Sequence, residues 1–224
     1  MRHSDAMTTG TGQLRGVTRR EGYLLVSILL VALVWSGIGA KSQGTWVLEV
    51  VWILLGAPLV LLNRRRFPLS RLVCWLLVLH AVVLCYGGHY TYAETPLGDW
   101  FQERFDLSRN HYDRFAHVVQ GFVPAMLVRE ILLRRSPLPP GGWTFTLTTA
   151  VCLSISACFE FVEWASAIIL GAGADEFLAT QGDVWDTQWD MFLCLCGALI
   201  GQLLLRRVHD RQLGLVPRSS HAFG

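Results

Sequence analysis

The amino-acid sequence predicts an all-α membrane protein, a polytopic bundle of about six transmembrane helices in a single domain. Composition is the first observation, since 52% of the 224 residues are hydrophobic and only 16% are charged, against about 25% charged residues in soluble domains. The second is distribution, because the apolar residues gather in runs close to the roughly 20 residues that a helix needs to cross a bilayer. Lipid is therefore the expected solvent for most of the chain.

The first half of the chain contains three such runs. Residues 22–40 carry no charged side chain, residues 46–63 carry only Glu49, and residues 69–88 contain His80 well inside the run. We expect all three to be helices, because backbone amides in lipid must form their hydrogen bonds within the segment. Glu49 and His80 each stand alone among apolar residues, so we interpret them as structural polar groups.

The second half contains three further runs, each with one polar end. Residues 114–133 and 186–205 begin with polar side chains, and residues 143–170 become acidic toward their end. We expect these to be helices as well, which gives one transmembrane domain over residues 15–212. The two ends of the chain are expected to be disordered, over residues 1–14 and 213–224. No cleaved signal peptide is expected, because the first apolar run is too long and no small-residue cleavage site follows it.

Arginine positions set the predicted orientation. They precede the first expected helix, lie between the second and third, and follow the fourth and the sixth, so alternate loops hold nearly all of them. The positions are Arg15, Arg19, Arg20, Arg64, Arg65, Arg66, Arg71, Arg134, Arg135, Arg206, Arg207 and Arg211. Cytoplasmic loops are enriched in Lys and Arg, so we expect both termini in the cytoplasm. The long loops at residues 89–113 and 171–185 then lie on the outer side.

Each of the last three expected helices carries polar side chains on one face of its outer part. A spacing of three or four residues puts the members of each set on the same side of a helix. The sets are Asn110, Asp113, His117 and Gln120; Glu160 and Glu163; and Asp183, Asp186, Thr187 and Asp190. A charge that faces lipid costs at least about 2.5–3.5 kcal/mol. We therefore expect the three faces to meet around a polar cavity that opens to the outside.

An acidic cavity of this kind suits a divalent metal ion. Its six carboxylates and one imidazole repel one another unless they share protons or a cation, and such ligands on facing helices suit Zn, Mn or Fe. The expected ligands are His117, Glu160, Glu163, Asp186 and Asp190, with His89 and His111 as further candidates from the loop. The other residues expected to line the polar site are Asn110, Asp113, Gln120, Gln181 and Thr187.

Two alternative functions remain open. The first is a metal-dependent hydrolase or transferase that acts on an envelope lipid or its precursor, with Glu160, Glu163 or Asp183 as the catalytic carboxylate. The second is a proton- or cation-coupled carrier or sensor, although the only charges deep on the cytoplasmic side of the fourth helix, Arg129 and Glu130, suggest a simple end-of-helix pair. The sequence thus leaves open whether the protein is an enzyme.

The expected partners are the lipid bilayer and, within it, a lipid or envelope-precursor ligand. Nucleic-acid binding is not expected, because the arginines form short pairs and triplets beside apolar runs and give no basic face.

Several long motifs resemble the YjdF type of bacterial inner-membrane protein. They are RRFPLSRL at 65–72, GGHYTYAETPLGDW at 87–100, RNHYDRFAHVVQGFVPA at 109–125, EFVEW at 160–164 and TQGDVWDTQWDMF at 180–192. The resemblance extends over about residues 22–212. It implies a multi-pass protein of the bacterial inner membrane. It implies no reaction, because the family is a domain of unknown function.

Overall fold

A computed structural model describes residues 14–170 and 179–215. Within these residues the chain is helical and contains no β-strand, which confirms the predicted all-α class. The helices are α1 (Arg19–Gly37), α2 (Gln43–Asn63), α3 (Arg71–Tyr90), the short 3-10 helix η1 (Tyr92–Glu94), α4 (Pro96–Phe105), α5 (Tyr112–Arg135), α6 (Gly142–Leu170) and α8 (Asp186–Gln212). Among the described helices, six are long and apolar enough to cross a membrane, as predicted. The expected disordered ends lie for the most part outside the described residues.

Local sequence signals explain where the first three helices begin. Thr18 and Glu21 form a reciprocal capping box at the start of α1, so α1 begins earlier than the predicted residue 22. Ser42 and Ser70 accept hydrogen bonds from backbone N–H groups in the first turns of α2 and α3. Such caps satisfy amides that a helix start leaves without partners. The observed bounds therefore differ from the expected ones by only a few residues.

The last helix, α8, extends well past residue 205, where the predicted segment ends. Its final turns pack on α5 through a buried polar network, which explains the extension. His209 Nε2 lies 3.1 Å from Glu130 Oε2, and Arg129 donates to Asp210 at 2.7 Å. Arg129 and Glu130 are therefore more than the end-of-helix pair that the sequence suggested, because they join α5 to α8.

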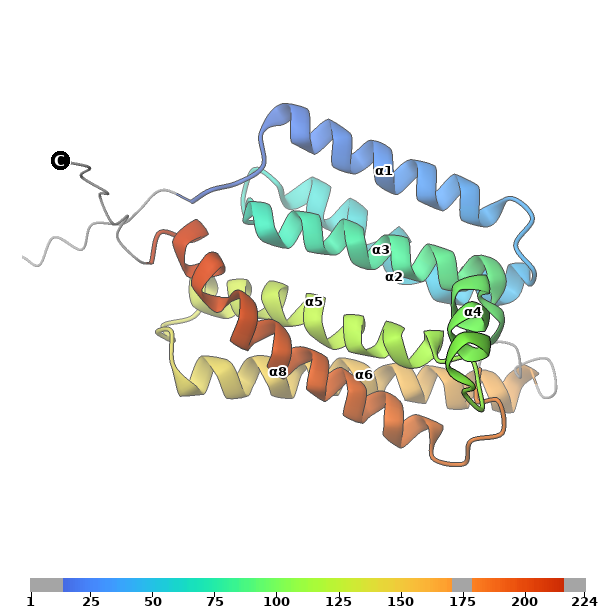
Figure 1. Cartoon of the computed structure of the whole chain (residues 1–224). Helices are drawn as coiled ribbons and strands as arrows, with labels where there is room; N and C mark the ends of the chain where they lie inside the picture. Colours follow the sequence, from blue (N-terminus) through green and yellow to red (C-terminus); the bar gives the residue numbers. More distant parts are fainter. Residues whose placement is uncertain (1–13, 171–178, 216–224) are drawn as a thin grey trace, which may run out of the picture.

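The long helices run back and forth, so their ends alternate between the two ends of the bundle (Figure 1). α3 packs against α1, α2 and α5, and α5 packs against α6 and α8. The start of α1 and the end of α8 meet at one end, where the Arg15 N–H donates to the Gln212 carbonyl at 2.8 Å. α4 lies across the opposite end (Figure 1). The arginine-rich helix ends gather at the end where α1 begins and α8 ends.

The segment at residues 89–113, which the sequence analysis treated as a loop, is largely helical. Pro96 stands in the first turn of α4, where its missing N–H removes no hydrogen bond, and Asp106 ends the helix in the left-handed conformation with φ of 51°. Gly98 packs directly on Asn110, since a Cβ at Gly98 would lie 1.8 Å from Asn110 Oδ1. α4 is thereby anchored to the segment that leads into α5.

Glycines allow α5 and α8 to approach backbone to backbone. A Cβ at Gly121 would lie 1.9 Å from the Cys194 carbonyl oxygen, and a Cβ at Gly197 would lie 2.0 Å from that of Val118. Small residues permit this close packing between transmembrane helices. The contact sets the polar start of α5 beside the polar start of α8, which is where the candidate site forms.

Candidate functional site

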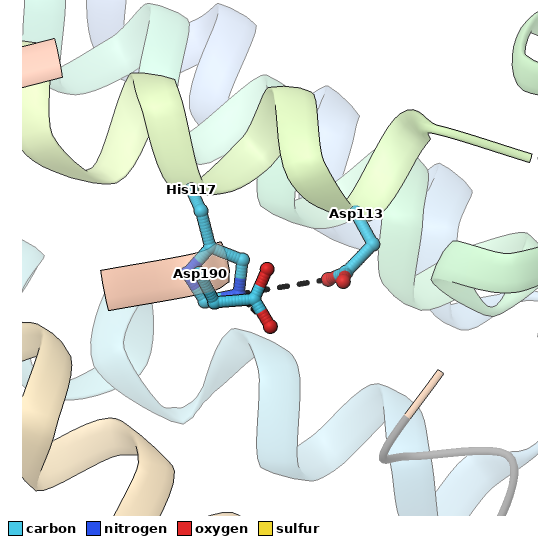
Figure 2. A group of neighbouring side chains, drawn as sticks. All are labelled: Asp113, His117 and Asp190. Carbon is cyan, nitrogen blue, oxygen red and sulfur yellow. Dashed lines mark ion pairs between the residues drawn. The ribbon is translucent and has the colours of Figure 1, made fainter. Parts of the chain in front are cut away.

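Three buried side chains from α5 and α8 converge at the polar starts of these helices (Figure 2). Asp113 and His117 lie one turn apart on α5, and Asp190 of α8 lies opposite them. His117 Nε2 lies 3.6 Å from Asp113 Oδ1 and 3.9 Å from Asp190 Oδ2, and one ligand atom of each residue lies within 4.8 Å of the others. Ligand atoms about 2.0–2.1 Å from a tetrahedral ion are roughly 3.4 Å apart. Small side-chain rotations would therefore bring the three to coordinating positions.

The polar atoms of this cluster are only partly satisfied. Asp113 Oδ2, His117 Nδ1 and Asp190 Oδ1 are buried and have no hydrogen-bond partner among the described residues. A buried polar atom without a partner costs about 1–3 kcal/mol, so native proteins seldom keep several of them together unless something binds there. Carboxylate and imidazole groups are ligands of Zn, Mn and Fe. The donor set therefore fits a divalent metal ion.

α6 adds two carboxylates to the cluster. Glu160 is 6% exposed and lies within electrostatic range of His117, with Thr187 nearby. Neither Glu160 oxygen has a partner at hydrogen-bond geometry in the described part of the chain. Glu163 lies one turn further along α6, within electrostatic range of Glu160 and Asp190. Both of these expected ligands therefore lie near the cluster, although the three ligand atoms within 4.8 Å of one another belong to Asp113, His117 and Asp190.

Asp183 and Asp186, also expected in the site, pair with arginines. Asp186 accepts a hydrogen bond from Arg109 at 2.7 Å, and both side chains are buried. Asp183 accepts one from Arg114 at 2.5 Å and another from the Trp185 backbone N–H at 2.9 Å. These ion pairs compensate the charges of the two carboxylates. The groups left to bind a metal are those of Asp113, His117, Glu160, Glu163 and Asp190.

Asn110 and Gln181 join the chain segments beside the cluster. Gln181 Oε1 accepts from the Asn110 N–H at 3.0 Å, and Gln181 Nε2 donates to the Asn110 carbonyl at 2.9 Å. The Asn110 side chain donates to Asp99 of α4 at 2.8 Å and to the Thr95 carbonyl at 3.0 Å. Both residues were expected to line the polar site. Through these hydrogen bonds, Asn110 and Gln181 connect the chain segments at this end of the bundle.

The two histidines of the segment before α5 do not join the three-residue cluster. His89 Nδ1 lies 3.0 Å from the Ser36 carbonyl, and its ring stacks on Trp35 with 4.6 Å between centroids, so it contacts α1. His111 occupies the N-cap position of α5. Partial burial and then the positive charge of Arg114 lower the pKa of His111, so this imidazole is neutral at neutral pH.

A cavity of about 1210 Å³ extends from the cluster into the bundle. Gln120 and Glu163 line its polar end together with Asp113 and His117. Buried Glu49 of α2 and His80 of α3 line the same cavity, although nothing in the local sequence pattern predicts this position. The lone polar residues of the first three helices thus belong to the surroundings of the site.

Tyr92 of η1 lines the cavity as well. Burial, and then the neighbouring Glu49 carboxylate, raise the pKa of Tyr92 well above its ordinary value. The phenol therefore stays protonated at neutral pH and keeps an O–H group that can donate a hydrogen bond.

Comparisons with known proteins agree with this architecture. The family described as "Predicted membrane protein (DUF2238)" matches residues 22–211. The inner membrane protein YjdF of Escherichia coli (strain K12) is 46% identical over 185 residues, which cover 83% of this chain and 88% of the relative. No solved structure matches the chain. Both descriptions name a membrane protein, and neither names a reaction.

Proposed function

Since the chain belongs to the DUF2238 family of predicted membrane proteins and is a multi-pass inner-membrane protein, we propose that it binds a divalent metal ion, Zn, Mn or Fe. The proposed ligands are Asp113, His117, Glu160 and Asp190. The observation that carries the proposal is the convergence of three buried ligand atoms within 4.8 Å of one another. Their remaining polar atoms support it further, because the described residues leave several of these atoms without hydrogen bonds.

The balance of charge around the cluster points the same way. Arg109 and Arg114 pair with Asp186 and Asp183. Within the described residues neither arginine forms an ion pair with Asp113, Glu160 or Asp190. Buried carboxylates that lack counter-charges either take up protons or bind a cation. With His117 Nε2 facing two of the carboxylates, the cluster offers one nitrogen and several oxygens to an ion, as zinc, manganese and iron sites do.

We also propose that the site lies near the extracytoplasmic surface and that both termini are cytoplasmic. Arginines flank the helix ends at the end of the bundle where α1 begins and α8 ends, and cytoplasmic segments of membrane proteins are rich in Lys and Arg. The cluster lies toward the other end, in the first turns of α5 and α8.

A second candidate function is hydrolysis or group transfer on an envelope lipid or its precursor. Glu163 favours it, because this carboxylate lines the cavity beside the proposed ligands. A bound metal would supply Lewis-acid activation, and Glu163 would accept or return a proton. Asp183, the other carboxylate considered for this role, is engaged by Arg114.

Metal analysis of the purified protein tests the proposed function. We expect about one equivalent of Zn, Mn or Fe per chain, and at least about tenfold weaker metal binding in His117→Ala and Asp190→Asn. Asp106→Asn is the matched control, since it removes an exposed carboxylate at the end of α4, and it should keep its metal. Wild-type protein that holds no metal, both as isolated and after incubation with each ion, would rule the proposal out.

The second candidate is tested separately. The metal-loaded protein is incubated with extracted envelope lipids, and the products are identified by mass spectrometry. Glu163→Gln should keep its metal and lose turnover. If every lipid is recovered unchanged from the wild-type reaction, the protein is not a hydrolase or transferase of this class.

A further inference from the structure

The cavity follows most of the length of α2. Its lining on this helix extends from Glu49 to Leu61, which corresponds to about 18 Å at 1.5 Å per residue; the hydrocarbon core of a bilayer is about 30 Å thick. Its volume of about 1210 Å³ exceeds the roughly 300–1,000 Å³ of pockets for drug-sized molecules. The space is therefore long and large enough for an extended hydrocarbon chain.

Between the polar end and Arg19, Arg64 and Arg65 at the opposite end, the walls of the cavity are mostly apolar. They include Ile53 and Val60 of α2 and Ile155 of α6. α2 packs on α1 and α3, whereas α6 packs on α5 and α8. The cavity is lined by both α2 and α6, and the rings of Trp52 and Phe159 contact each other across it with 6.3 Å between centroids. Leu59 of α2 and Val151 of α6 line it and are also exposed at the surface of the bundle. The cavity therefore opens sideways, between α2 and α6, toward the membrane.

The loop side of the cluster is closed by interactions within the protein. Arg109 and Asp186 form a buried ion pair before α5 and at the start of α8, and Asn110 exchanges two hydrogen bonds with Gln181 beside it. A ligand reaches the cluster more easily through the sideways opening than past these bonds. A molecule already dissolved in the bilayer has that access.

The polar end of the cavity contains buried donors as well as the cluster. Tyr92 is 5% exposed, and its hydroxyl lies beside the Glu49 carboxylate, with which it interacts. The Nε2 of His80 has no hydrogen-bond partner among the described residues. A phenol and an imidazole both donate to oxygen. Carboxylates alone would repel an anionic headgroup, but a divalent ion among them neutralises two of their charges and offers phosphate oxygens a direct ligand position.

We propose that the cavity binds a membrane lipid with a phosphate headgroup. This proposal rests on the proposed metal site. The phosphate lies against the metal held by Asp113, His117 and Asp190, within reach of Tyr92 and His80. The hydrocarbon chain follows the apolar wall between α2 and α6. The lipid enters from the bilayer through the sideways opening.

Native mass spectrometry of the metal-loaded protein in detergent tests this with three probes. Dioleoylphosphatidic acid carries both phosphate and chains, dioleoylglycerol carries the chains alone, and glycerol 3-phosphate carries the phosphate alone. We expect phosphatidic acid to bind at least about tenfold more tightly than either of the other two. Equal binding of phosphatidic acid and dioleoylglycerol would overturn the proposal, because chains alone would then account for the affinity.

A substitution that fills the cavity gives the second readout. A Cβ at Gly56 would meet nothing within 4 Å, and Gly56 lines the cavity, so Gly56→Phe should weaken phosphatidic acid binding at least about tenfold and leave the metal content unchanged. Gly44→Phe is the matched control, since Gly44 lies on the same helix in equally open space and does not line the cavity. Gly44→Phe should change neither phosphatidic acid binding nor metal content.

The outcomes separate the two proposals. A wild-type protein without metal contradicts the metal site itself. Normal metal content together with unchanged phosphatidic acid binding in Gly56→Phe contradicts the lipid proposal and leaves the metal site standing. Asp190→Asn should lose metal and phosphatidic acid binding together, and lipid binding that survives the loss of metal would contradict recognition of the phosphate through the ion.

Discussion

Asp190 is the side chain on which the cluster depends most. It is 2% exposed, its Oδ2 lies 3.9 Å from His117 Nε2, and its Oδ1 has no hydrogen-bond partner in the described residues. It comes from α8, whereas Asp113 and His117 come from α5, so a metal bound here would join the two helices. An ion that binds the folded protein and does not bind the unfolded protein would also stabilise the folded state.

Metal should therefore raise the melting temperature of the wild-type protein and leave that of Asp190→Asn unchanged. At a metal concentration of 100 times the dissociation constant, the expected stabilisation is about 2.7 kcal/mol. Differential scanning fluorimetry in detergent, with and without Zn, measures the shift, and Asp106→Asn should respond as the wild type does. An equal rise in the melting temperature of Asp190→Asn would show that the ion binds elsewhere.

Arg109 illustrates a different kind of buried charge. Its guanidinium donates to Asp186 at 2.7 Å and to the Ala179 carbonyl at 3.1 Å. Removal of one partner from a buried ion pair leaves the other charge uncompensated, which costs about 3–5 kcal/mol. Arg109→Met should therefore be strongly destabilised, and a second substitution, Asp186→Asn, should restore part of the loss. Thermal unfolding of both single variants and the double variant measures the coupling free energy between Arg109 and Asp186. If the effects of the two substitutions on stability simply add, the two side chains do not stabilise the protein as an ion pair.

Single residues also show what the sequence can predict about the site. The three- and four-residue spacing of Asp113 and His117 puts both on one helix face, and the structure brings both to Asp190. The same periodicity grouped Asp186 with Asp190, but it contains no information about Arg109, which comes from 77 residues earlier. Residue spacing therefore predicts which side chains share a helix face, but it does not predict contacts between segments that are distant in the sequence.

Glu49 and His80 were placed correctly in their helices, but their position beside the cavity was not predicted. Each stands alone among apolar residues, so no local pattern connects it with the acidic helices. For Glu49 a signal was present in its depth. Glu49 lies six residues into α2 and His117 five residues into α5, which puts both about 8–9 Å from the same end of the bundle at 1.5 Å per residue.

At the scale of secondary-structure elements, the close contact between α5 and α8 assembles the site. Gly197 fits against the Val118 carbonyl, and Gly121 fits against that of Cys194. A side chain at either glycine forces the helices apart, and the ligands on the two helices move apart with them. The geometry of the cluster is therefore a property of helix packing as much as of its own side chains.

Gly197→Val should destabilise the protein by about 1–3 kcal/mol or more, as overpacking of a tight interface does, and should reduce metal binding. Gly44→Val introduces the same side chain where a Cβ would meet nothing within 4 Å and serves as the control. Thermal unfolding and metal analysis of both variants test this. A Gly197→Val protein with wild-type stability would show that the helices do not pack as closely as described.

The elements differ in how well composition predicts them. The six long helices follow from apolar runs near the thickness of the bilayer, because lipid leaves the backbone no alternative. α4 was missed, since its ten residues include charged and aromatic side chains without an apolar run. Its helical form depends on Pro96 at its start and on the contact of Gly98 with Asn110, which is visible only in three dimensions.

At the scale of the whole molecule, the two ends of the bundle differ in how their charges are compensated. At the end where the arginines gather, Glu130 contacts His209 and Arg134, and Arg129 pairs with Asp210. These charges satisfy one another and bind α5 to α8.

The proposed orientation follows from the same asymmetry, and site-directed labelling tests it. In a variant without its six native cysteines, Asp106→Cys and Arg65→Cys place a thiol at opposite ends of the bundle. A membrane-impermeant maleimide added to intact spheroplasts should label Asp106→Cys and should label Arg65→Cys only after permeabilisation. The reverse pattern would invert the topology and place the cluster near the cytoplasm.

X-ray absorption spectroscopy of the zinc-loaded protein tests the proposed metal site, because it reports the atoms bound to the ion. We expect a shell of oxygen and nitrogen at about 2.0–2.1 Å with an imidazole contribution, and this imidazole contribution should disappear in His117→Ala. Cys152 and Cys194 are buried near the same helix crossing, so sulfur is a real alternative. A zinc–sulfur distance of about 2.3 Å, or an unchanged shell in His117→Ala, would contradict the proposed site.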